Sequence, residues 1–191
     1  VTLGKILVDG VDVRDFNVKA LRHKIGFIPQ KALLFTGTIA ENLRYGKEDA
    51  SIEELDKAAD VAQAKEFIES KQFDTHLAEG CSNLSGGQKQ RLSIARAVVK
   101  EPDIYIFDDS FSALDYKTDA TLRKRLKEVT GDATVLIVAQ RVGTIMDADQ
   151  IIVLDHGEIV GRGTHEELLA TNEIYSEIAR SQLNNQSLTE E

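Results

Sequence analysis

Leu84-Ser85-Gly86-Gly87-Gln88 begins a predicted helix, and the apolar run 104–107, which ends in Asp108-Asp109, follows it as a predicted strand. Ser85-x-x-Gln88 has the spacing of a capping box, in which the two side chains satisfy backbone N–H groups at the start of a helix. Two glycines carry no Cβ, so the positive end of the helix dipole stays accessible to an anion. Without its context, the same run would equally be a cap and a tight turn.

Strands and helices alternate along the chain. The expected strands are 5–9, 24–29, 104–107, 134–139 and 150–154, with a returning edge strand at 157–161. The expected helices are 17–23, 51–70, one from Ser85 that ends before Pro102, 117–129, and two after Thr164, the second over 173–182. Apolar strands separated by helices are covered on both faces, which predicts an α/β fold with a mainly parallel sheet flanked by helices. Functional groups should gather at the carboxyl ends of the strands.

The composition is that of one ordinary α/β domain. The chain has 191 residues, 42% hydrophobic and 29% charged, which suffices for one substantial core. Its 23 Lys and Arg residues against 32 Asp and Glu residues give a net charge of −9, which argues against a nucleic-acid partner. The single cysteine, Cys81, excludes an internal disulfide, and no apolar run approaches the ~18 residues that cross a bilayer.

A phosphate-binding loop of the form G-x-x-x-x-G-K-[ST] is missing from the sequence. The nearest matches, Gly4-Lys5-Ile6 and Gly46-Lys47-Glu48, lack the preceding glycine and the hydroxyl. No Met opens the chain and no signal-like segment follows. We therefore expect Val1 to be a partial start and the chain to be truncated on its N-terminal side.

The order of the motifs resembles one protein family. The run Leu84–Gln88 leads through a Pro-ended helix to the apolar strand with its two acids, and then to Ser112-Ala113-Leu114-Asp115. This order is similar to that of the nucleotide-binding domain of ABC transporters, in which LSGGQ is the signature, the strand with its acids is Walker B and S-A-L-D is the D-loop. The resemblance covers residues 1 to 183 and implies a P-loop NTPase-like fold with a helical subdomain that carries the signature.

The resemblance divides 1–191 into the parts of one incomplete nucleotide-binding domain. We expect a core remnant with the Q-loop at 1–46, the helical subdomain and signature at 47–100, the catalytic core at 101–183, and a loose tail at 184–191. Walker A, the aromatic residue that stacks on adenine and a membrane segment are the parts of an exporter that this sequence does not contain.

The two acids after the apolar strand are the expected metal-binding and catalytic residues. Asp108 ends a buried strand, where an unpaired carboxylate is costly, so Mg²⁺ is the expected partner, with a turn-capping role as the alternative. By resemblance, Asp108 supports the Mg²⁺ of bound ATP. Asp109 stands where the family usually has Glu as general base, and it is one methylene shorter. Because proton transfer needs hydrogen-bond reach to the attacking water, we expect slow hydrolysis at Asp109.

Gln140 occupies the position of the family's switch histidine. Its amide can hydrogen-bond a γ-phosphate but cannot carry a proton, so we expect it to fill the catalytic position only in part. Together, Asp109 and Gln140 resemble the degenerate site of heterodimeric multidrug-type exporters. In this family LSGGQ acts in trans: it completes the ATP site of a partner domain. The resemblance therefore implies this role for the residues of the signature run, which are Leu84, Ser85, Gly86, Gly87 and Gln88.

The Q-loop position is Gln30, whose amide, by resemblance, contacts Mg²⁺ and the γ-phosphate; an isolated Gln after a strand would be an ordinary loop residue. The following run L-F-x-G-T-I-x-E-N is typical of exporters. We expect Leu33, Leu34 and Phe35 to form an apolar patch for a transmembrane domain, within a contact region from Gln30 to Gly46, or else to be core residues.

The D-loop residues Ser112 and Asp115 are also expected at the nucleotide. Asp115 is expected to cross a dimer interface, to cap the helix from Lys117, or to do both. A basic set on the signature helix follows one helical face, which we interpret as solvated or intersubunit: Lys89, Arg91, Arg96 and Lys100.

The resemblance therefore implies an ATP-binding subunit or domain of an ABC exporter, at the cytoplasmic face of the cell membrane, with ATP and Mg²⁺ as cofactors. A second nucleotide-binding domain and transmembrane domains are the expected partners, and the isolated chain is expected to turn over no ATP. One alternative is a homodimeric exporter with an active Asp109 and Gln140 site. Another is a soluble ABC ATPase without a transport role, against which the exporter-type run after Gln30 argues.

Overall fold

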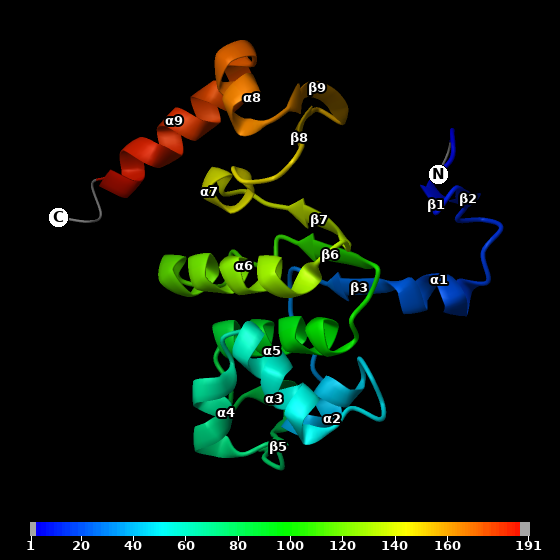
Figure 1. Ribbon diagram of the computed structural model, residues 1–191. Helices are drawn as coiled ribbons and strands as arrows, with labels where there is room; N and C mark the ends of the chain where they lie inside the picture. The colour runs from blue at the N-terminus through cyan, green and yellow to red at the C-terminus, as the bar shows by residue number, and fades with distance from the viewer. Residues whose placement is uncertain (1–2, 188–191) are drawn as a thin grey trace. The chain divides into compact units, whose positions relative to one another are not determined.

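The computed structural model describes residues 3–187, which form two compact units that divide between Val138 and Ala139. Figure 1 traces the chain from one unit to the other. Each unit has its own apolar core, and we describe the two separately.

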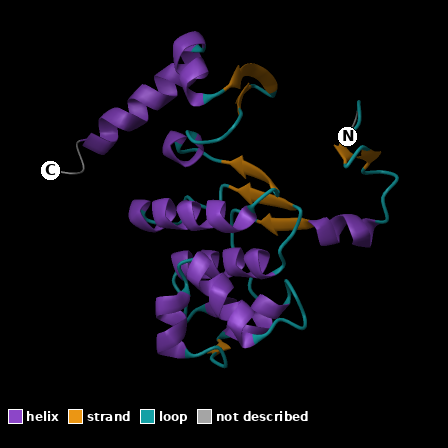
Figure 2. Cartoon of the chain, viewed as in Figure 1, coloured by secondary structure: helices purple, strands orange, loops and turns teal. Residues whose placement is uncertain are grey.

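A three-stranded parallel sheet lies at the centre of the first unit. The strands β3 (Ile25–Ile28), β6 (Ile104–Asp108) and β7 (Thr134–Val138) are hydrogen-bonded in that order. Figure 2 shows the three strands side by side, with helices around them. The parallel sheet that the alternating pattern predicts is therefore confirmed, and it places the carboxyl ends of β3 and β6 next to each other.

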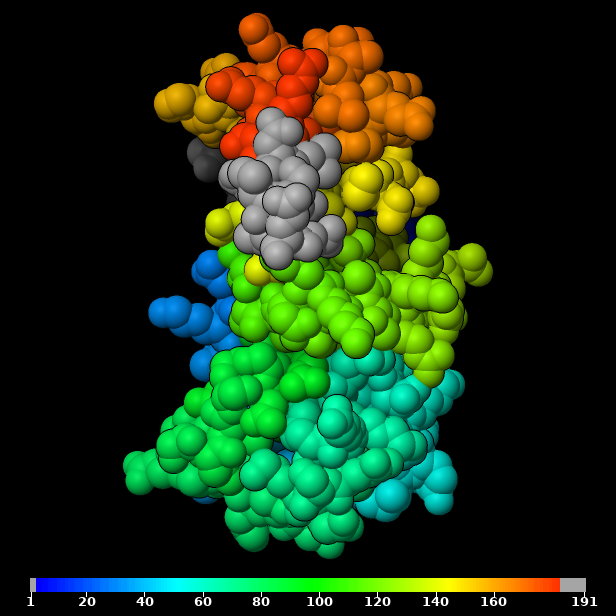
Figure 3. Space-filling view, turned by 90° about the vertical axis from the view of Figure 1, so that its left-hand side faces the viewer, coloured from blue at the N-terminus to red at the C-terminus, as the bar shows by residue number. Residues whose placement is uncertain are grey.

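The part of the chain between β3 and β6 in the sequence is mainly helical. Its helices are α2 (Ile39–Arg44), α3 (Ile52–Val61), α4 (Lys65–Lys71) and α5 (Gly86–Val99), joined by the short pair β4 (Gly37–Thr38) and β5 (His76–Leu77) and the 3₁₀ turn Glu79–Cys81. The helix α6 (Tyr116–Thr130) packs Leu122 and Leu126 into the same core as Phe107 of the sheet. In the space-filling view, α6 in yellow-green borders the helical part in cyan to green (Figure 3).

The capping boxes predicted at Ser51 and Ser85 are present at the starts of α3 and α5. The single helical stretch predicted over 51–70 is wrong, because α3 ends at Val61 and α4 begins at Lys65. Gln63 separates them with a φ of 56°, which is left-handed and ends a right-handed helix. Apolar spacing alone did not reveal this break, since residues on both sides of it face the same core.

The N-terminal segment forms a small hairpin of β1 (Leu7–Val8) and β2 (Val11–Asp12), followed by α1 (Val18–Lys24). Asp9 and Gly10 connect the strands with φ angles of 50° and 79°, as two-residue hairpin turns require. The strand predicted over 5–9 is thus shortened, because the Asp-Gly turn begins inside it. The helix predicted over 17–23 is present, and Asn17 caps it.

The second unit contains α7 (Val142–Ile145), the antiparallel hairpin β8 (Ile151–Asp155) and β9 (Glu158–Gly163), and the helices α8 (His165–Thr171) and α9 (Glu173–Ser187). Its core is small: Val142, Ile151, Val153, Leu168, Tyr175 and Ala179. The loose tail predicted from Asn184 is wrong for residues 184–187, since α9 continues through them and 173–187 contains no Gly or Pro to end a helix. The rest of that predicted tail, 188–191, lies outside the described residues.

Between residues 3 and 187, no helix is both long and apolar enough to span a bilayer.

Gly46 marks a close contact between the segment after α2 and the helix α5. A Cβ at this position would lie 2.2 Å from the carbonyl oxygen of Arg96 and 2.9 Å from a methyl group of Val99. Gly86, at the start of α5, is different, because a Cβ there would meet no atom within 4 Å.

We predict that Gly46→Ala lowers the free energy of unfolding by about 1–3 kcal/mol, because a backbone oxygen cannot move aside as a side chain can. Gly86→Ala is the matched control and should leave this free energy unchanged or slightly raised, since alanine is the better helix former. Urea unfolding followed by circular dichroism measures both variants. Equal destabilisation of the two would contradict the close packing of Gly46 on α5.

Candidate functional site

Gln30 and Asp109 meet at the carboxyl ends of neighbouring parallel strands. The side-chain amide nitrogen Nε2 of Gln30 donates a hydrogen bond of 3.0 Å to Oδ2 of Asp109. The Asp109 backbone N–H donates to the carbonyl oxygen of Val138 at 2.9 Å, so strands on both sides of β6 hold this residue. Asp109 is 9% exposed, and its φ of 45° is left-handed. The structure therefore brings together two residues that the sequence places 79 positions apart.

Neighbouring side chains fix the ends of β3 and β6. Ser110 is fully buried, and its hydroxyl donates to the carbonyl oxygen of Ile28 at 3.3 Å. Gln90 of α5 is also buried and donates from Nε2 to the carbonyl oxygen of Pro29 at 3.0 Å. The residue before Gln30 is thereby tied to the same helix that carries the predicted signature.

Asp108 ends β6 and is half-buried. Within residues 3–187 the structure contains no hydrogen bond or ion pair of its carboxylate, which leaves both oxygens for a ligand. The same described part of the chain holds no cluster of three or more His, Cys, Asp or Glu side chains that could enclose a metal. A single carboxylate suits Mg²⁺, which usually takes one or two carboxylates and fills its remaining positions with phosphate oxygens and water.

The loop after β6 is ordered by its own side chains. The hydroxyl of Ser112 donates to the carbonyl oxygen of Asp109 at 2.7 Å. Asp115 caps α6, because its carboxylate accepts hydrogen bonds from the Thr118 N–H at 2.9 Å and from the Thr118 hydroxyl at 2.7 Å. These hydrogen bonds from Thr118 hold the pKa of Asp115 below its ordinary value. The capping role predicted for Asp115 is confirmed, and the role at a dimer interface stays a prediction.

The start of α5 is open to the surroundings of the chain. Ser85 Oγ accepts from the Gln88 N–H at 3.2 Å, and Gln88 Oε1 accepts from the Ser85 N–H at 3.0 Å. The N–H groups of Gly86 and Gly87 have no partner among the described residues. Since packing within the chain would tolerate a Cβ at Gly86, the chain itself does not require glycine there. An anion from outside the chain is the ligand that these free N–H groups suit.

Leu84 contributes differently from the four residues that follow it. Its side chain is 6% exposed and belongs to the core, and its N–H donates to the carbonyl oxygen of Cys81 at 3.1 Å. Both groups are thus used inside the chain. Leu84 anchors the start of α5, and Ser85 to Gln88 are the residues that face outward.

The exporter-type run after Gln30 carries a partly exposed apolar patch. Leu33 is 66% exposed and Phe35 is 45% exposed, whereas Leu34 packs against the core. Tyr45 lies against Phe35 with a ring-centroid distance of 4.5 Å. The patch predicted from three residues is therefore formed by Leu33 and Phe35, extended by Tyr45.

Two residues hold this patch in place: Asn42, whose role the sequence did not reveal, and Arg96, for which the sequence suggested another role. Asn42 is buried, and its side chain hydrogen-bonds the N–H and carbonyl oxygen of Phe35 and the carbonyl oxygen of Thr38. Arg96, interpreted from the sequence as solvated or intersubunit, is partly buried and donates to the carbonyl oxygen of Leu33 while its guanidinium lies 5.6 Å from the Phe35 ring centroid. The capping box Thr38-x-x-Glu41 is the signal that could have revealed α2 and, one position on, the inward Asn42.

The other basic residues on α5 also make contacts within the chain. Arg91 lies over the Phe67 ring and donates to the carbonyl oxygen of Gln63, and Lys100 donates to the carbonyl oxygens of Arg22 and Ile25. Burial lowers the pKa of Arg91 and of Lys100. Of the two alternatives predicted for the basic set, the solvated face is wrong for these positions, because the guanidinium and ammonium groups bind backbone carbonyls, and the intersubunit face stays a prediction.

Gln140 belongs to the second unit, unlike the other predicted site residues. It is exposed, and its backbone carbonyl oxygen accepts a hydrogen bond from Gln182 Nε2 at 2.8 Å. Oε1 of Gln182 in turn accepts from the N–H of Val142 at 2.8 Å, which ties the start of α7 to α9. The segment around Gln140 is therefore held by α9.

We predict a pH dependence from Asp115. Its pKa is lowered in the folded state, so the stabilisation is present above the ordinary pKa of 3.8 and is lost as the pH falls through the lower folded-state value. Asn can cap a helix but does not titrate in this range. The difference in unfolding free energy between the wild type and Asp115→Asn should therefore shrink from about pH 6 to about pH 3. A difference that stays constant over this range would contradict the ionised cap.

Several known proteins are similar to this chain. An ABC transporter ATP-binding protein of Mycobacterium tuberculosis is 50% identical over 185 residues, which are 95% of this chain and 32% of the relative. A beta-(1→2)glucan export ATP-binding/permease protein of Rhodopseudomonas palustris is 48% identical over 181 residues, 94% of this chain and 30% of the relative. An ATP-dependent lipid A-core flippase of Mannheimia succiniciproducens is 44% identical over 184 residues, 95% of this chain and 32% of the relative.

A solved structure of a bacterial Atm1-family ABC exporter with ATP bound superposes with a TM-score of 0.90 at 39% identity, over 94% of this chain and 32% of that one. This likeness confirms the predicted α/β fold with its parallel sheet flanked by helices. The chain spans 30–32% of the length of these relatives. The family model for ABC transporters matches residues 1–112, which is more than half of the 191 residues, and the chain therefore belongs to the ABC transporter family.

Proposed function

We propose that this chain is the ATP-binding part of an ABC exporter, which couples ATP binding and hydrolysis to the export of a substrate across a membrane. The observation that carries the proposal is the open start of α5, where Gly86 and Gly87 present N–H groups that no residue between 3 and 187 accepts from. The names of the relatives, among them a glucan exporter and a lipid A-core flippase, support an export role.

ATP would act by holding two nucleotide-binding domains together. An ATP bound on one domain places its γ-phosphate at the start of α5 in the other, where the helix dipole and the Ser85 hydroxyl favour negative charge. ATP can drive closure only if it binds the closed pair more tightly than the open one. The contacts of Ser85 to Gln88 supply this difference, because they exist only in the closed pair.

On its own nucleotide, this chain would contribute the groups at the ends of β3 and β6. Asp108 would hold Mg²⁺, and the Gln30 amide would reach the metal and the γ-phosphate. Mg²⁺, when bound, neutralises the developing charge on the phosphate oxygens. Ser112 and Asp115 follow on a loop that is anchored to Asp109, so the three would move as one unit with the metal site.

We propose that this site hydrolyses ATP slowly and that a second, different subunit supplies the active one. Asp109 is shorter than Glu by one methylene, and its hydrogen bond from Gln30 directs one carboxylate oxygen toward the β3 end. A general base must lie within hydrogen-bond reach of the attacking water, and a shift of about 1 Å costs on the order of 10²-fold in rate. Gln140 cannot replace the charge of a protonated histidine.

The apolar patch of Leu33, Phe35 and Tyr45 is our proposed contact for the transmembrane domains, within the region 30–46. It lies on the segment that begins at Gln30, so a movement of the nucleotide site would be passed directly to the membrane part. Arg96 and Asn42 hold the patch to the helical region. We therefore expect the chain to lie at the cytoplasmic face of the membrane in the full-length exporter.

We predict that Gly86→Ala in the full-length transporter lowers ATPase activity by at least about tenfold, because a methyl group covers N–H groups meant for phosphate. Gly143→Ala is the control, since a Cβ there also meets no atom within 4 Å but lies outside the signature. Steady-state phosphate release measures both. Unchanged activity of Gly86→Ala would contradict a role of the α5 start in ATP binding.

We predict that Asp109→Asn leaves the turnover of the assembled transporter nearly unchanged, whereas a Glu→Gln change at the equivalent position of the partner lowers it by on the order of 10²-fold or more. Asp109→Glu should raise hydrolysis at this chain's own site, since it restores the missing methylene. Loss of all turnover in Asp109→Asn, with activity in preparations of this subunit alone, would instead favour a homodimeric exporter with an active Asp109 site.

A further inference from the structure

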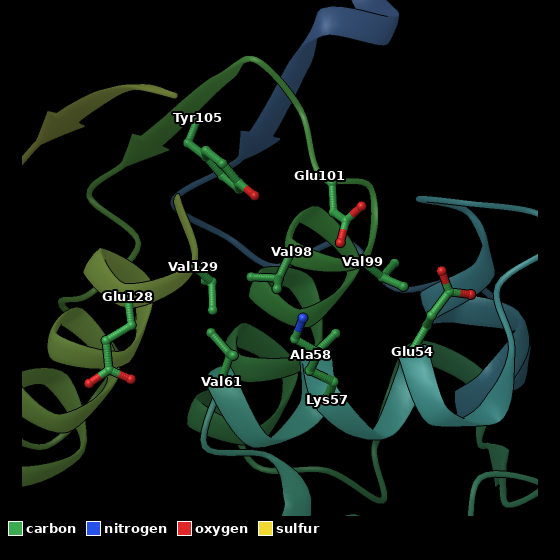
Figure 4. A pocket seen from close by; sticks show the side chains of 10 residues that line it. All are labelled: Glu54, Lys57, Ala58, Val61, Val98, Val99, Glu101, Tyr105, Glu128 and Val129. Atoms are coloured by element: carbon green, nitrogen blue, oxygen red, sulfur yellow. The ribbon is translucent and has the colours of Figure 1, made fainter. Parts of the chain in front are cut away.

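A cavity of about 450 Å³ opens in the first unit, away from the residues of the nucleotide site. It lies where α3, the last turn of α5, the start of β6 and the last turn of α6 come together, and Figure 4 shows its lining. Tyr105, the second residue of β6, lines it, whereas Asp108 and Asp109 lie at the other end of that strand. A cavity of this size is in the range of small-molecule sites.

The floor of the cavity is apolar. Val61 of α3, Val98 and Val99 of α5 and Val129 of α6 face it, together with Ala58. All but Val129 are buried. This surface would cover the hydrocarbon part of a ligand.

The Tyr105 hydroxyl is a polar group without a partner in this apolar setting. Tyr105 is 2% exposed, and Figure 4 shows its hydroxyl directed into the cavity. No hydrogen bond to this hydroxyl is present within residues 3–187. Burial, and the negative charge of Glu101 nearby, raise the pKa of Tyr105 to about 12, so the phenol is neutral at physiological pH. Among the described residues, Ser93 Oγ is the one fully buried polar side-chain atom without a partner, so the Tyr105 hydroxyl keeps some contact with water, and a ligand in the cavity would take the place of that water as its hydrogen-bond partner.

Glu101 adds a carboxylate at the same end of the cavity. Three glutamates line the cavity, and two of them have partners: Glu54 bonds Lys47 and the Ser51 N–H, and Glu128 bonds Arg125. The Glu101 carboxylate has no hydrogen bond or ion pair within the described part of the chain, although its charge acts on Lys47 and Tyr105. Its side chain follows the C-terminal end of α5, where the helix dipole is negative.

We infer that this cavity binds a small organic cation, a primary ammonium group on an apolar chain. The ammonium would donate hydrogen bonds to the Glu101 carboxylate and the Tyr105 hydroxyl oxygen, and the chain would lie on the four valines. Lysine ammonium groups already present do not pair with Glu101 within residues 3–187: Lys57 lines the cavity but makes no ion pair there, Lys100 donates to Arg22 and Ile25, and Lys47 is engaged with Glu54. No covalent step is involved.

Lys57 on α3 also lines the cavity and carries the one positive charge among its ionisable lining residues. Its charge opposes a cation and favours an anion. Removal of the Lys57 charge should therefore strengthen the binding of a cation and weaken the binding of an anion. A variant at this position thus reports the sign of the ligand's charge.

The test uses n-hexylammonium as the cationic probe. Two probes with the same chain length serve as comparisons: 1-hexanol, which is neutral, and hexanoate, which is anionic. Binding to the 191-residue chain is followed by titration calorimetry and by the NMR signals of the valine methyl groups. We expect hexylammonium to bind at least about tenfold more tightly than hexanol and to shift the methyl signals of Val61, Val98 and Val129. Equal binding of hexanol and hexylammonium, or of hexanoate in place of both, would overturn the inference.

Variants locate the site. Glu101→Gln should weaken hexylammonium binding at least about tenfold and Tyr105→Phe about fivefold, with hexanol unchanged, because only the polar contacts are removed. Lys57→Gln should strengthen hexylammonium binding. Glu48→Gln makes the same charge change as Glu101→Gln at an exposed position outside the cavity and should have no effect. A silent Glu101→Gln would refute the site. Binding of an acetyl- and methylamide-capped lysine in preference to hexylammonium would assign the cavity to a partner polypeptide and overturn the small-molecule ligand.

Discussion

The hydrogen bond from Gln30 to Asp109 joins the carboxyl ends of two parallel strands whose residues are far apart in the sequence. It can form only because β3 and β6 are neighbours in parallel register, with Ile25 beside Ile104. Ser110 and Gln90 fix the backbone on either side of it. The nucleotide site proposed here, the apolar patch that follows Gln30 and the loop that leads to Asp115 all extend from this one contact.

Two surfaces of the first unit have groups that the chain itself does not satisfy, and they differ in charge preference. The start of α5 presents N–H groups and suits an anion, as expected for ATP held by a second domain. The cavity at the far end of the same helix presents a carboxylate and a phenol oxygen and suits a cation. The two preferences follow the dipole of one 14-residue helix, positive at Gly86 and negative at Val99.

Sequence reasoning succeeds where local chemistry dictates structure. The capping boxes at Ser51 and Ser85, the helix over 17–23 and the apolar strands of the parallel sheet follow from rules that operate within a few residues. It fails where distant segments decide: Arg96 turns inward because the Leu33 carbonyl lies beside it, and the helix over 51–70 breaks at Gln63. The residues of the candidate site were predictable from motif order, whereas the contact between Gln30 and Asp109 depends on tertiary packing. The same holds for the Tyr105 hydroxyl in the cavity outside that site.

The most direct test of the account is the distance from the start of α5 to ATP that a partner domain holds. Pulsed electron paramagnetic resonance measures this distance in the full-length assembly. One spin is a nitroxide attached at Ser82→Cys in a Cys81→Ser background, and the other is Mn²⁺ bound together with ATP in place of Mg²⁺. We expect a short distance that disappears when the partner's phosphate-binding loop is disabled by substitution. A short distance that persists without the partner's loop would mean that the start of α5 serves its own chain's nucleotide, and the account would be wrong.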